Sequence, residues 1–300
     1  MNLPTEPVHR SGFAALVGRP NVGKSTLLNA LVGQKLSIVT PRPQTTRHRI
    51  LGLYSTPQVQ IAFLDTPGLH REASRALNKA MNRTATAALE EADVVVLVLE
   101  ALKWTAEDDL ALERLKRSGR AAIAAVNKVD RVRPRERLLP YLGTLGQRHP
   151  FLAVVPVSAL RSDNVEALRH AIASHLPPGP ALFPEGELTD RGIEFRIAEM
   201  IREKLTLELN QEVPYGIAVE VERLTRADGQ LTVDAAIWVD REGQKPIVIG
   251  AKGARLKRVG TAARLTLNEM LQERLHLNLW VKVRENWADN ARALKELGLE

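Results

Sequence analysis

The stretch Gly18-Arg19-Pro20-Asn21-Val22-Gly23-Lys24-Ser25 decides the fold of this 300-residue chain. Its spacing is that of a phosphate-binding loop: a glycine, four residues, a glycine, a lysine, and then serine or threonine. An apolar run at residues 13–17 precedes it, and residues 25–32, including Thr26, have the pattern of a helix. Glycines let the backbone wrap a phosphate chain, while N–H groups at the helix start point at the anion. The sequence therefore predicts a nucleotide-binding loop in an α/β domain.

A second motif, Asp65-Thr66-Pro67-Gly68, follows the apolar residues 59–64. An Asp-x-x-Gly match alone is weak, but behind a phosphate loop it becomes strong. The Asp65 carboxylate would hold Mg²⁺ through water, and the Gly68 N–H would bond the γ-phosphate. In the same scheme Lys24 reaches the β- and γ-phosphates and the Ser25 hydroxyl binds Mg²⁺. These residues predict chemistry at the γ-phosphate of a nucleoside triphosphate.

The motif Asn127-Lys128-Val129-Asp130 follows the apolar run 121–126 and selects the base. A carboxylate accepts two hydrogen bonds from N1–H and the 2-amino group of guanine, a pattern that adenine lacks. Rejection of the wrong base leaves the carboxylate unpaired, which costs a few kcal/mol. A further stretch, Ser158-Ala159-Leu160, lies where a backbone N–H can meet guanine O6. The four motifs in this order predict GTP, not ATP, as the ligand.

Composition narrows the cellular context. The absence of cysteine excludes disulfides, thiolate metal sites and thiol nucleophiles, and it fits a reducing cytosol. Residues 1–10 contain no apolar core, and no apolar run reaches the length of a membrane span. A formal net charge of +7 permits an anionic partner such as nucleic acid or a membrane surface. We therefore expect a cytoplasmic protein, for which weak peripheral contact with the inner face of the cell membrane stays open.

The order of predicted elements divides the chain in two. Strands alternate with helices up to residue 175, which is typical of an open α/β sheet with its ligand at the strand ends. Beyond it we expect an α+β unit: a helix at 190–209, strands at 216–223, 231–239, 246–249 and 277–283, and a helix ending near 274. The predicted division is a tail at 1–10, a GTPase domain at 11–176, a proline-rich linker at 177–188, a second domain at 189–285 and a C-terminal tail or helix at 286–300.

The second domain carries a concentrated basic site. Between residues 241 and 264 the chain has seven basic residues and one acidic residue. The loop Gly250-Ala251-Lys252-Gly253 resembles the Gly-x-x-Gly loop of a KH domain, in which two glycines let the backbone approach a sugar-phosphate chain. A lone match of this kind is usually a turn, but the surrounding α+β order and the basic helix after it favour RNA binding. The candidate RNA-binding residues are Ile249, Gly250, Ala251, Lys252, Gly253, Arg255, Lys257 and Arg258.

Together these motifs resemble the translation-factor-related class of small GTPases. The stretches Pro43-Gln44-Thr45-Thr46-Arg47-His48-Arg49 and Asp65-Thr66-Pro67-Gly68-Leu69-His70, with the C-terminal unit, narrow the resemblance to the Era family over residues 12–299. This resemblance implies a Ras-like P-loop GTPase domain followed by a type II KH domain. It implies slow, Mg²⁺-dependent GTP hydrolysis, binding of the single-stranded 3′ end of 16S ribosomal RNA, a role in 16S rRNA processing and 30S subunit maturation, and a monomer.

The resemblance also assigns roles to individual residues. Thr46 completes the Mg²⁺ shell when GTP is bound, so Lys24, Thr46 and Gly68 are the candidate catalytic residues and Ser25, Thr46 and Asp65 the candidate Mg²⁺ ligands. Leu69 stands where Ras-like GTPases carry a glutamine that orients the attacking water, and leucine has no donor or acceptor. Related GTPases of this kind use potassium, which makes Asn21 a candidate K⁺ ligand. A role of Asn21 in shaping the turn is the alternative. Ala251 departs from family members that carry a second basic residue in this loop.

Other interpretations stay open at this point. An RNA-binding assembly chaperone with incidental GTP turnover would bind RNA equally with GTP and GDP. A membrane-associated regulatory GTPase would need a peripheral contact with the inner membrane face, for which the chain has no strong amphipathic anchor. A potassium-dependent GTPase of tRNA modification relies on a C-terminal cysteine, which this chain lacks. Trp238 and Trp280 alternate with apolar residues and are expected in a core, and Trp104 and Trp287 either in a core or at a partner contact.

Overall fold

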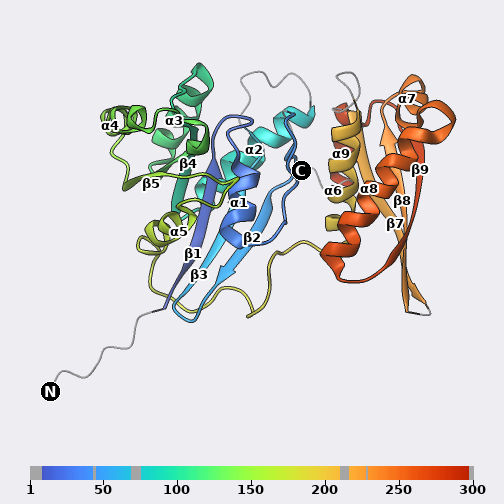
Figure 1. Ribbon diagram of the computed structural model, residues 1–300, viewed down its shortest axis with the longest axis horizontal. Helices are drawn as coiled ribbons and strands as arrows, with labels where there is room; N and C mark the ends of the chain where they lie inside the picture. Colours follow the sequence, from blue (N-terminus) through green and yellow to red (C-terminus); the bar gives the residue numbers. More distant parts are fainter. Residues whose placement is uncertain (1–8, 43–44, 69–75, 210–215, 228, 297–300) are drawn as a thin grey trace. The chain divides into compact units, whose positions relative to one another are not determined.

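The computed structural model describes residues 9–42, 45–68, 76–209, 216–227 and 229–296. The chain forms two compact units (Figure 1). The first comprises Met1–Ser37, Thr46–Ala73 and Met81–Asp190, and the second Ile38–Thr45, Ser74–Ala80 and Arg191–Glu300. The predicted order of an α/β unit and then an α+β unit is confirmed.

The first unit is built on a six-stranded sheet in the order β2-β3-β1-β4-β5-β6. All neighbouring pairs are parallel except β2 and β3, which are antiparallel. The apolar runs of β4 and β5 form central strands that are buried on both faces, as parallel strands require. The bounds are Arg10–Val17 for β1, Ile50–Ser55 for β2, Val59–Asp65 for β3, Val94–Glu100 for β4, Ala122–Asn127 for β5 and Ala153–Pro156 for β6.

Helices cover both faces of this sheet (Figure 1). Helices α2, α3 and α4 contribute to one apolar core with alternate residues of the strands, and α1 and α5 contact the opposite face. Because the strands run parallel, their carboxyl ends meet at one edge, where the loops before α1 and after β3, β5 and β6 emerge. The helices span Lys24–Val32 for α1, Ala76–Glu91 for α2, Ala106–Ser118 for α3, Leu138–Arg148 for α4 and Val165–Ala173 for α5.

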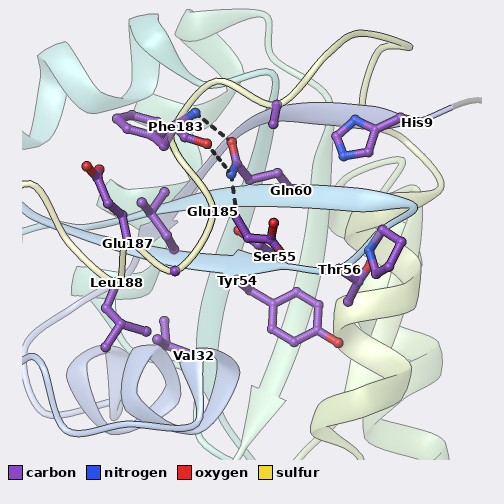
Figure 2. A pocket seen from close by; sticks show the side chains of 14 residues that line it. His9, Val32, Tyr54, Ser55, Thr56, Gln60, Phe183, Glu185, Glu187 and Leu188 are labelled. Carbon is purple, nitrogen blue, oxygen red and sulfur yellow. Dashed lines mark hydrogen bonds between the residues drawn. The ribbon is translucent and has the colours of Figure 1, made fainter.

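Residues 177–188 form neither a helix nor a strand, as their proline content predicts. The segment is nevertheless fixed to the first unit, because the side chain of Gln60 in β3 bonds the backbone of Phe183 (Figure 2) and accepts a hydrogen bond from the N–H of Leu182. Farther along, Leu53 of β2 donates its N–H to the carbonyl of Leu188 at 2.9 Å. A cavity of about 760 Å³ lies between this segment and strands β2 and β3.

The second unit contains a three-stranded sheet in the order β7-β8-β9. Strands β7 and β8 are antiparallel and β8 and β9 parallel. Helices α6 and α8 pack on one face and close the apolar core (Figure 1). The bounds are Ile193–Glu208 for α6, Ile217–Ala227 for β7, Gln230–Val239 for β8, Lys245–Ile249 for α7, Ala254–Leu271 for α8, Leu275–Val283 for β9 and Ala291–Glu296 for α9.

The strand expected at 246–249 is wrong: this segment is the short helix α7. Pro246 stands in the first turn of that helix, where its missing N–H costs no intrahelical bond. Val248 points into the core, and Gly250, at φ 75°, ends the helix. A four-residue apolar run does not distinguish a strand from a buried helical turn.

Trp238 and Trp280 lie outside the core, contrary to expectation. Their strand neighbours Ile237 and Val281 point into it, so the two indole rings occupy the opposite face of the sheet. There they flank Lys282, whose Nζ lies 5.4 Å from the Trp238 ring and 5.7 Å from the Trp280 ring. Trp287, in contrast, is fully buried.

Candidate nucleotide site and nucleic-acid groove

The phosphate-binding loop connects β1 to α1 at the carboxyl edge of the first sheet. Gly23 caps α1 with φ 100°, a conformation that L side chains rarely adopt. A Cβ at this position would come within 2.4 Å of Asn127 Nδ2, so the glycine is also required for close approach of the loop after β5. The loop is thus shaped by backbone conformation and places the N-terminus of α1 at the predicted phosphate position.

Lys24 is the first residue of α1, and its side chain is buried. Its Nζ donates to the carbonyls of Gly18 at 3.0 Å and Arg19 at 3.1 Å, which fold the side chain back over the loop. Burial lowers the pKa of Lys24 to about 8, although the charge of Asp65 acts in the opposite direction. A bound polyphosphate would add negative charge beside this ammonium and would raise its pKa again.

The candidate Mg²⁺ ligands Ser25, Thr46 and Asp65 bring their side-chain oxygens together. Ser25 Oγ donates to Asp65 Oδ2 at 2.8 Å and lies 2.7 Å from Thr46 Oγ1. Asp65 is fully buried, and burial raises its pKa against the charge of Lys24 and the hydroxyl bonds. Within the described residues, Asp65 Oδ1 is a buried acceptor without a hydrogen-bond partner. A cluster of hydroxyl and carboxylate oxygens with spare acceptor capacity suits a hard divalent cation.

The end of the second motif approaches the phosphate loop. A Cβ on Gly68 would lie 2.9 Å from Pro20 Cγ, so a larger residue could not keep this approach. Thr66 donates its hydroxyl to the carbonyl of Leu16 at 2.9 Å and thereby joins the end of β3 to β1. Pro67 precedes Gly68, and Leu69, the residue in place of a catalytic glutamine, lies outside the described residues.

The loops after β5 and β6 form the predicted base-recognition region. Asn127 Nδ2 donates to the carbonyl of Val22 in the phosphate loop at 2.9 Å, and its Oδ1 accepts from the N–H of Ala159 at 3.0 Å. Ser158 donates its hydroxyl to Asp130 Oδ1 at 2.7 Å, which orients the carboxylate. The side chain of Leu160 is 73% exposed. Asn127 therefore joins three of the predicted motifs through its two amide atoms.

Three residues at this site escaped the sequence analysis. Ser37 donates its hydroxyl to Asp65 Oδ2 at 2.9 Å, and no sequence pattern marks it. Glu100 and Asp108 are both paired with Arg19 of the phosphate loop. Asp108 stands three residues after Thr105 in a capping box, a pattern that was visible in the sequence but carried no functional signal.

In the second unit, the loop between α7 and α8 has the backbone expected for close contact with a sugar-phosphate chain. Gly250 and Gly253 have φ values of 75° and 78°, and Lys252 between them has φ 49°. A Cβ on Gly250 would lie 2.7 Å from Arg255 Cβ, whereas a Cβ on Gly253 would meet open space. Gly253 caps α8, so the positive end of the helix faces the loop.

A groove of about 410 Å³ extends from this loop along α8 and β9. One wall is cationic, with Lys257 and Arg264, and Leu277 and Leu279 of β9 add an apolar surface suited to unstacked bases. Most of this lining carries no local sequence signal, because β9 joins the groove only through the tertiary fold. The lining residues are Gly253, Leu256, Lys257, Gly260, Thr261, Arg264, His276, Leu277 and Leu279.

Several predicted RNA-binding residues lie beside the groove rather than in its lining. Ile249 packs against the core, and Arg255 donates from Nη1 to the carbonyl of Ile247. Arg258 pairs with Glu208 at 3.2 Å. Ala251 is exposed in the loop beside Lys252. The groove thus retains Gly253 and Lys257 from the predicted set in its lining.

None of the helices in the described ranges is long and apolar enough to cross a lipid bilayer.

Comparison with known proteins assigns both units. Residues 13–128 match the family model "50S ribosome-binding GTPase", and residues 212–288 match the model "KH domain". GTPase Era of Marinobacter nauticus is 49% identical over 296 residues, covering 99% of this chain and 97% of the relative. GTPase Era of Xanthomonas oryzae pv. oryzae is 48% identical over 300 residues, with full coverage of both chains.

Solved structures agree over nearly the whole chain. A variant of Aquifex aeolicus Era bound to GDP and AlF4⁻ has a TM-score of 0.93 and 38% identity, covering 97% of this chain and 99% of its own. A structure of Era in complex with MgGDPNP and nucleotides 1506–1542 of 16S ribosomal RNA has the same TM-score, identity and coverage. With the site geometry and the full-length relatives in agreement, the chain belongs to the Era family of GTPases.

Proposed function

We propose that this GTPase binds the single-stranded 3′ end of 16S ribosomal RNA through its KH domain and acts in 16S rRNA processing and 30S subunit maturation in the cytoplasm. The observation that carries the proposal is the pairing, in one chain, of a described guanine-nucleotide motif set, joined through Asn127, with a loop-and-groove site of KH type. The relative whose structure contains 16S ribosomal RNA nucleotides matches 97% of this chain and supports the identity of the RNA.

The nucleotide site assigns a role to each motif. Residues 18–26 would wrap the phosphates, with Lys24 donating to the β- and γ-phosphates once its bonds to the Gly18 and Arg19 carbonyls are exchanged. Asp130 would accept the two guanine N–H groups, held in orientation by the Ser158 hydroxyl. Asn127 would keep the base loop against the phosphate loop through its bond to Val22, and the Ala159 N–H would meet guanine O6 once its bond to Asn127 Oδ1 is exchanged.

The oxygen cluster of Ser25, Thr46 and Asp65 fits Mg²⁺. The buried, unpartnered Asp65 Oδ1 is the observation that supports this fit, since a buried carboxylate oxygen is costly unless it is paired. Mg²⁺ would neutralise charge on the β- and γ-phosphates, and the Gly68 N–H would bond the γ-phosphate. A structure of a relative that contains MgGDPNP supports the same metal.

Hydrolysis would be slow, because Leu69 stands where Ras-like GTPases carry the glutamine that orients the attacking water, and leucine has no donor or acceptor. Asn21 is our candidate K⁺ ligand. Asn21 is exposed and has a φ of 62°, and its carbonyl accepts a hydrogen bond from Lys128 Nζ at 2.6 Å. A potassium ion held there would add positive charge at the phosphates, in the role that an arginine finger has in other GTPases.

In the KH domain, Gly250 and Gly253 would let the loop backbone approach the RNA phosphates, and Lys252 would add charge. The groove behind the loop would hold unstacked bases against Leu277 and Leu279. We propose a division into a GTPase domain at 11–176, a linker at 177–188, a KH domain at 189–285 and a C-terminal segment at 286–300.

GTP would favour one arrangement of the chain for RNA binding, and hydrolysis would reset it. Linkage then requires bound RNA to change nucleotide affinity by the same factor. Equal RNA affinity in both nucleotide states would instead describe an assembly chaperone with incidental turnover.

The proposal is tested by two titrations of the full chain. Fluorescent GDP is displaced by GTP, ITP and ATP, and we expect displacement by GTP, weaker displacement by ITP, which lacks the 2-amino group, and none by ATP. A single strand with the 3′-end 16S sequence is titrated against wild type, Gly253→Asp and Gly253→Asn. Both side chains fit the open space, and both variants carry the same backbone strain at φ 78°, which Asn and Asp bear better than other residues, so the two variants differ from each other in charge alone. Loss of RNA binding in the aspartate variant alone would support the site, whereas unchanged RNA binding in both variants would contradict it.

A further inference from the structure

A buried charged network lies beneath the phosphate loop and extends beyond the residues that would touch nucleotide. Arg19, the second residue of the loop, is 6% exposed and turns its guanidinium toward the protein interior. Its Nη2 donates to Glu100 Oε2 at 2.6 Å and its Nε donates to Asp108 Oδ2 at 3.1 Å. The loop residue is therefore held by two carboxylates from different elements, the end of β4 and the start of α3.

Glu100 has a second cationic partner in the base-recognition motif. Its Oε2 lies 3.3 Å from Lys128 Nζ, and the same Nζ donates to the carbonyl of Asn21 at 2.6 Å. Burial alone would raise the pKa of Glu100, but the Arg19 hydrogen bond and the Lys128 charge outweigh it and hold the pKa below its usual range. One carboxylate thus bridges a cation of the phosphate loop and a cation of the guanine loop.

Asp108 fixes the other end of Arg19. It is fully buried in the first turn of α3, where its Oδ2 accepts hydrogen bonds from the N–H and the hydroxyl of Thr105 at 2.9 Å each. A buried carboxylate is costly unless it is paired, so Asp108 and Arg19 each depend on the other. Because the capping box fixes Asp108 to the helix, the position of α3 sets the position of Arg19.

The network is connected to Lys24 and to the guanine loop through backbone carbonyls of the phosphate loop. The carbonyl of Arg19 accepts a hydrogen bond from Lys24 Nζ at 3.1 Å, and the carbonyl of Asn21 accepts from Lys128. Because the Arg19 guanidinium anchors the phosphate loop to two carboxylates, its displacement would shift the loop backbone that holds Lys24 in the ligand-free site. Displacement of Lys128 would shift the loop that carries Asp130.

We infer that Glu100 and Asp108 are positioning residues of the nucleotide site, which hold the phosphate loop and the guanine loop at the spacing of one guanine nucleotide. Neither residue is part of a nucleotide-binding motif, and each acts through Arg19 or Lys128. The inference rests on the proposed nucleotide site. It predicts that loss of either carboxylate weakens GDP and GTP alike, because the base-to-phosphate spacing is common to both.

The test uses Glu100→Gln, Asp108→Asn, Arg19→Gln and the double variant Arg19→Gln with Glu100→Gln. The control is Glu113→Gln, an exposed position of α3 whose partner Arg117 lies 3.9 Å away on the surface. We expect the Kd of fluorescent GDP and the KM for GTP to rise roughly tenfold or more, with faster GDP dissociation and kcat changed by less than about threefold. The double variant should lose no more GDP affinity than the weaker-binding single variant, because Arg19 and Glu100 act as a unit.

All affinities are measured well below the unfolding temperature of each variant. GDP affinity within about twofold of wild type in both carboxylate variants, even with a lowered Tm, would overturn the positioning role and leave a structural one. Full additivity in the double variant would also overturn it. If wild type itself failed to bind GDP, the proposed nucleotide site would fall, and this inference with it.

Discussion

Gln60 and Phe183 exchange two hydrogen bonds between a strand and the segment that leads to the second unit. The N–H of Phe183 donates to Gln60 Oε1, and Gln60 Nε2 donates to the carbonyl of Phe183, both at 2.9 Å (Figure 2). The same Oε1 accepts from the N–H of Leu182 at 2.7 Å, and Nε2 also donates to Ser55 Oγ at 3.1 Å. The buried amide of Gln60 therefore supplies the hydrogen bonds that a neighbouring strand would otherwise supply to this segment, which cannot itself form a strand.

Replacement Gln60→Leu should release this segment while keeping the side-chain volume. Two backbone N–H groups and a carbonyl lose their partner, which we expect to cost about 2 kcal/mol of unfolding free energy. Limited proteolysis should cut the variant faster within residues 177–188. The matched control is Gln58→Leu, because Gln58 is exposed two residues earlier. Equal cleavage rates in the two variants would contradict the role of Gln60.

Nucleotide affinity should depend on pH through Lys24. In the ligand-free protein, burial lowers the pKa of Lys24 to about 8 from 10.5, and a bound phosphate would raise it again. Below about pH 8 the ammonium is charged in both states, so binding takes up no proton. Above it the free protein has lost the proton that the complex holds, so affinity should fall by up to about tenfold per pH unit.

Calorimetric GDP titrations between about pH 7 and pH 9, in buffers of different ionisation enthalpy, measure this proton uptake. The control is Lys24→Arg, which keeps the charge but does not titrate in this range. Proton uptake that persists in the variant would assign the effect to another group. The sign for stability is opposite: the ligand-free protein should gain stability as pH rises from about 8 toward 10.5, since the unfolded chain then binds more protons.

GTP turnover should be faster in K⁺ than in Na⁺ at equal ionic strength. We expect roughly a tenfold or larger difference, because a cation at Asn21 would stabilise charge that develops on the phosphates. Asn21→Gly removes the side chain and tolerates the φ of 62°, so it should abolish the difference and leave the Na⁺ rate unchanged. Equal wild-type turnover rates in the two salts would contradict a role for K⁺ at Asn21.

Replacement Ala251→Lys should strengthen RNA binding. Ala251 is exposed in the Gly250–Gly253 loop, so an added lysine can reach a phosphate without a change in the groove. We expect tighter binding at low salt and a slope of log K against log salt that is steeper by about 0.7 to 1. Gln230→Lys, exposed at the β7–β8 turn, adds the same charge away from the loop and should leave the slope nearly unchanged. Equal slopes in the two variants would show a general charge effect.

The elements with strong local patterns could be predicted from sequence. The apolar runs of β4 and β5 are buried on both faces, and each nucleotide motif follows the strand that was expected to precede it. Local patterns sufficed there, because the carboxyl ends of parallel strands meet at one edge without knowledge of side-chain contacts.

Features set by long-range contacts could not be predicted. The run at 246–249 was too short to distinguish a strand from α7, and the face of Trp238 and Trp280 depends on strand register. Glu100 and Gln60 act through partners 81 and 123 residues away, respectively. The sequence shows a glutamate at the end of one strand and a glutamine within another, and only the fold supplies the residues that they bond.

The most direct test of nucleotide-dependent RNA binding compares affinities in the two states. A single strand with the 3′-end 16S sequence is titrated against the full chain with a non-hydrolysable GTP analogue and with GDP, at one stated salt concentration. We predict tighter binding with the analogue and loss of binding in both states for Gly253→Asp. The analogue's own affinity should rise by the same factor when RNA is present. Equal RNA affinity with the analogue and with GDP would contradict the account.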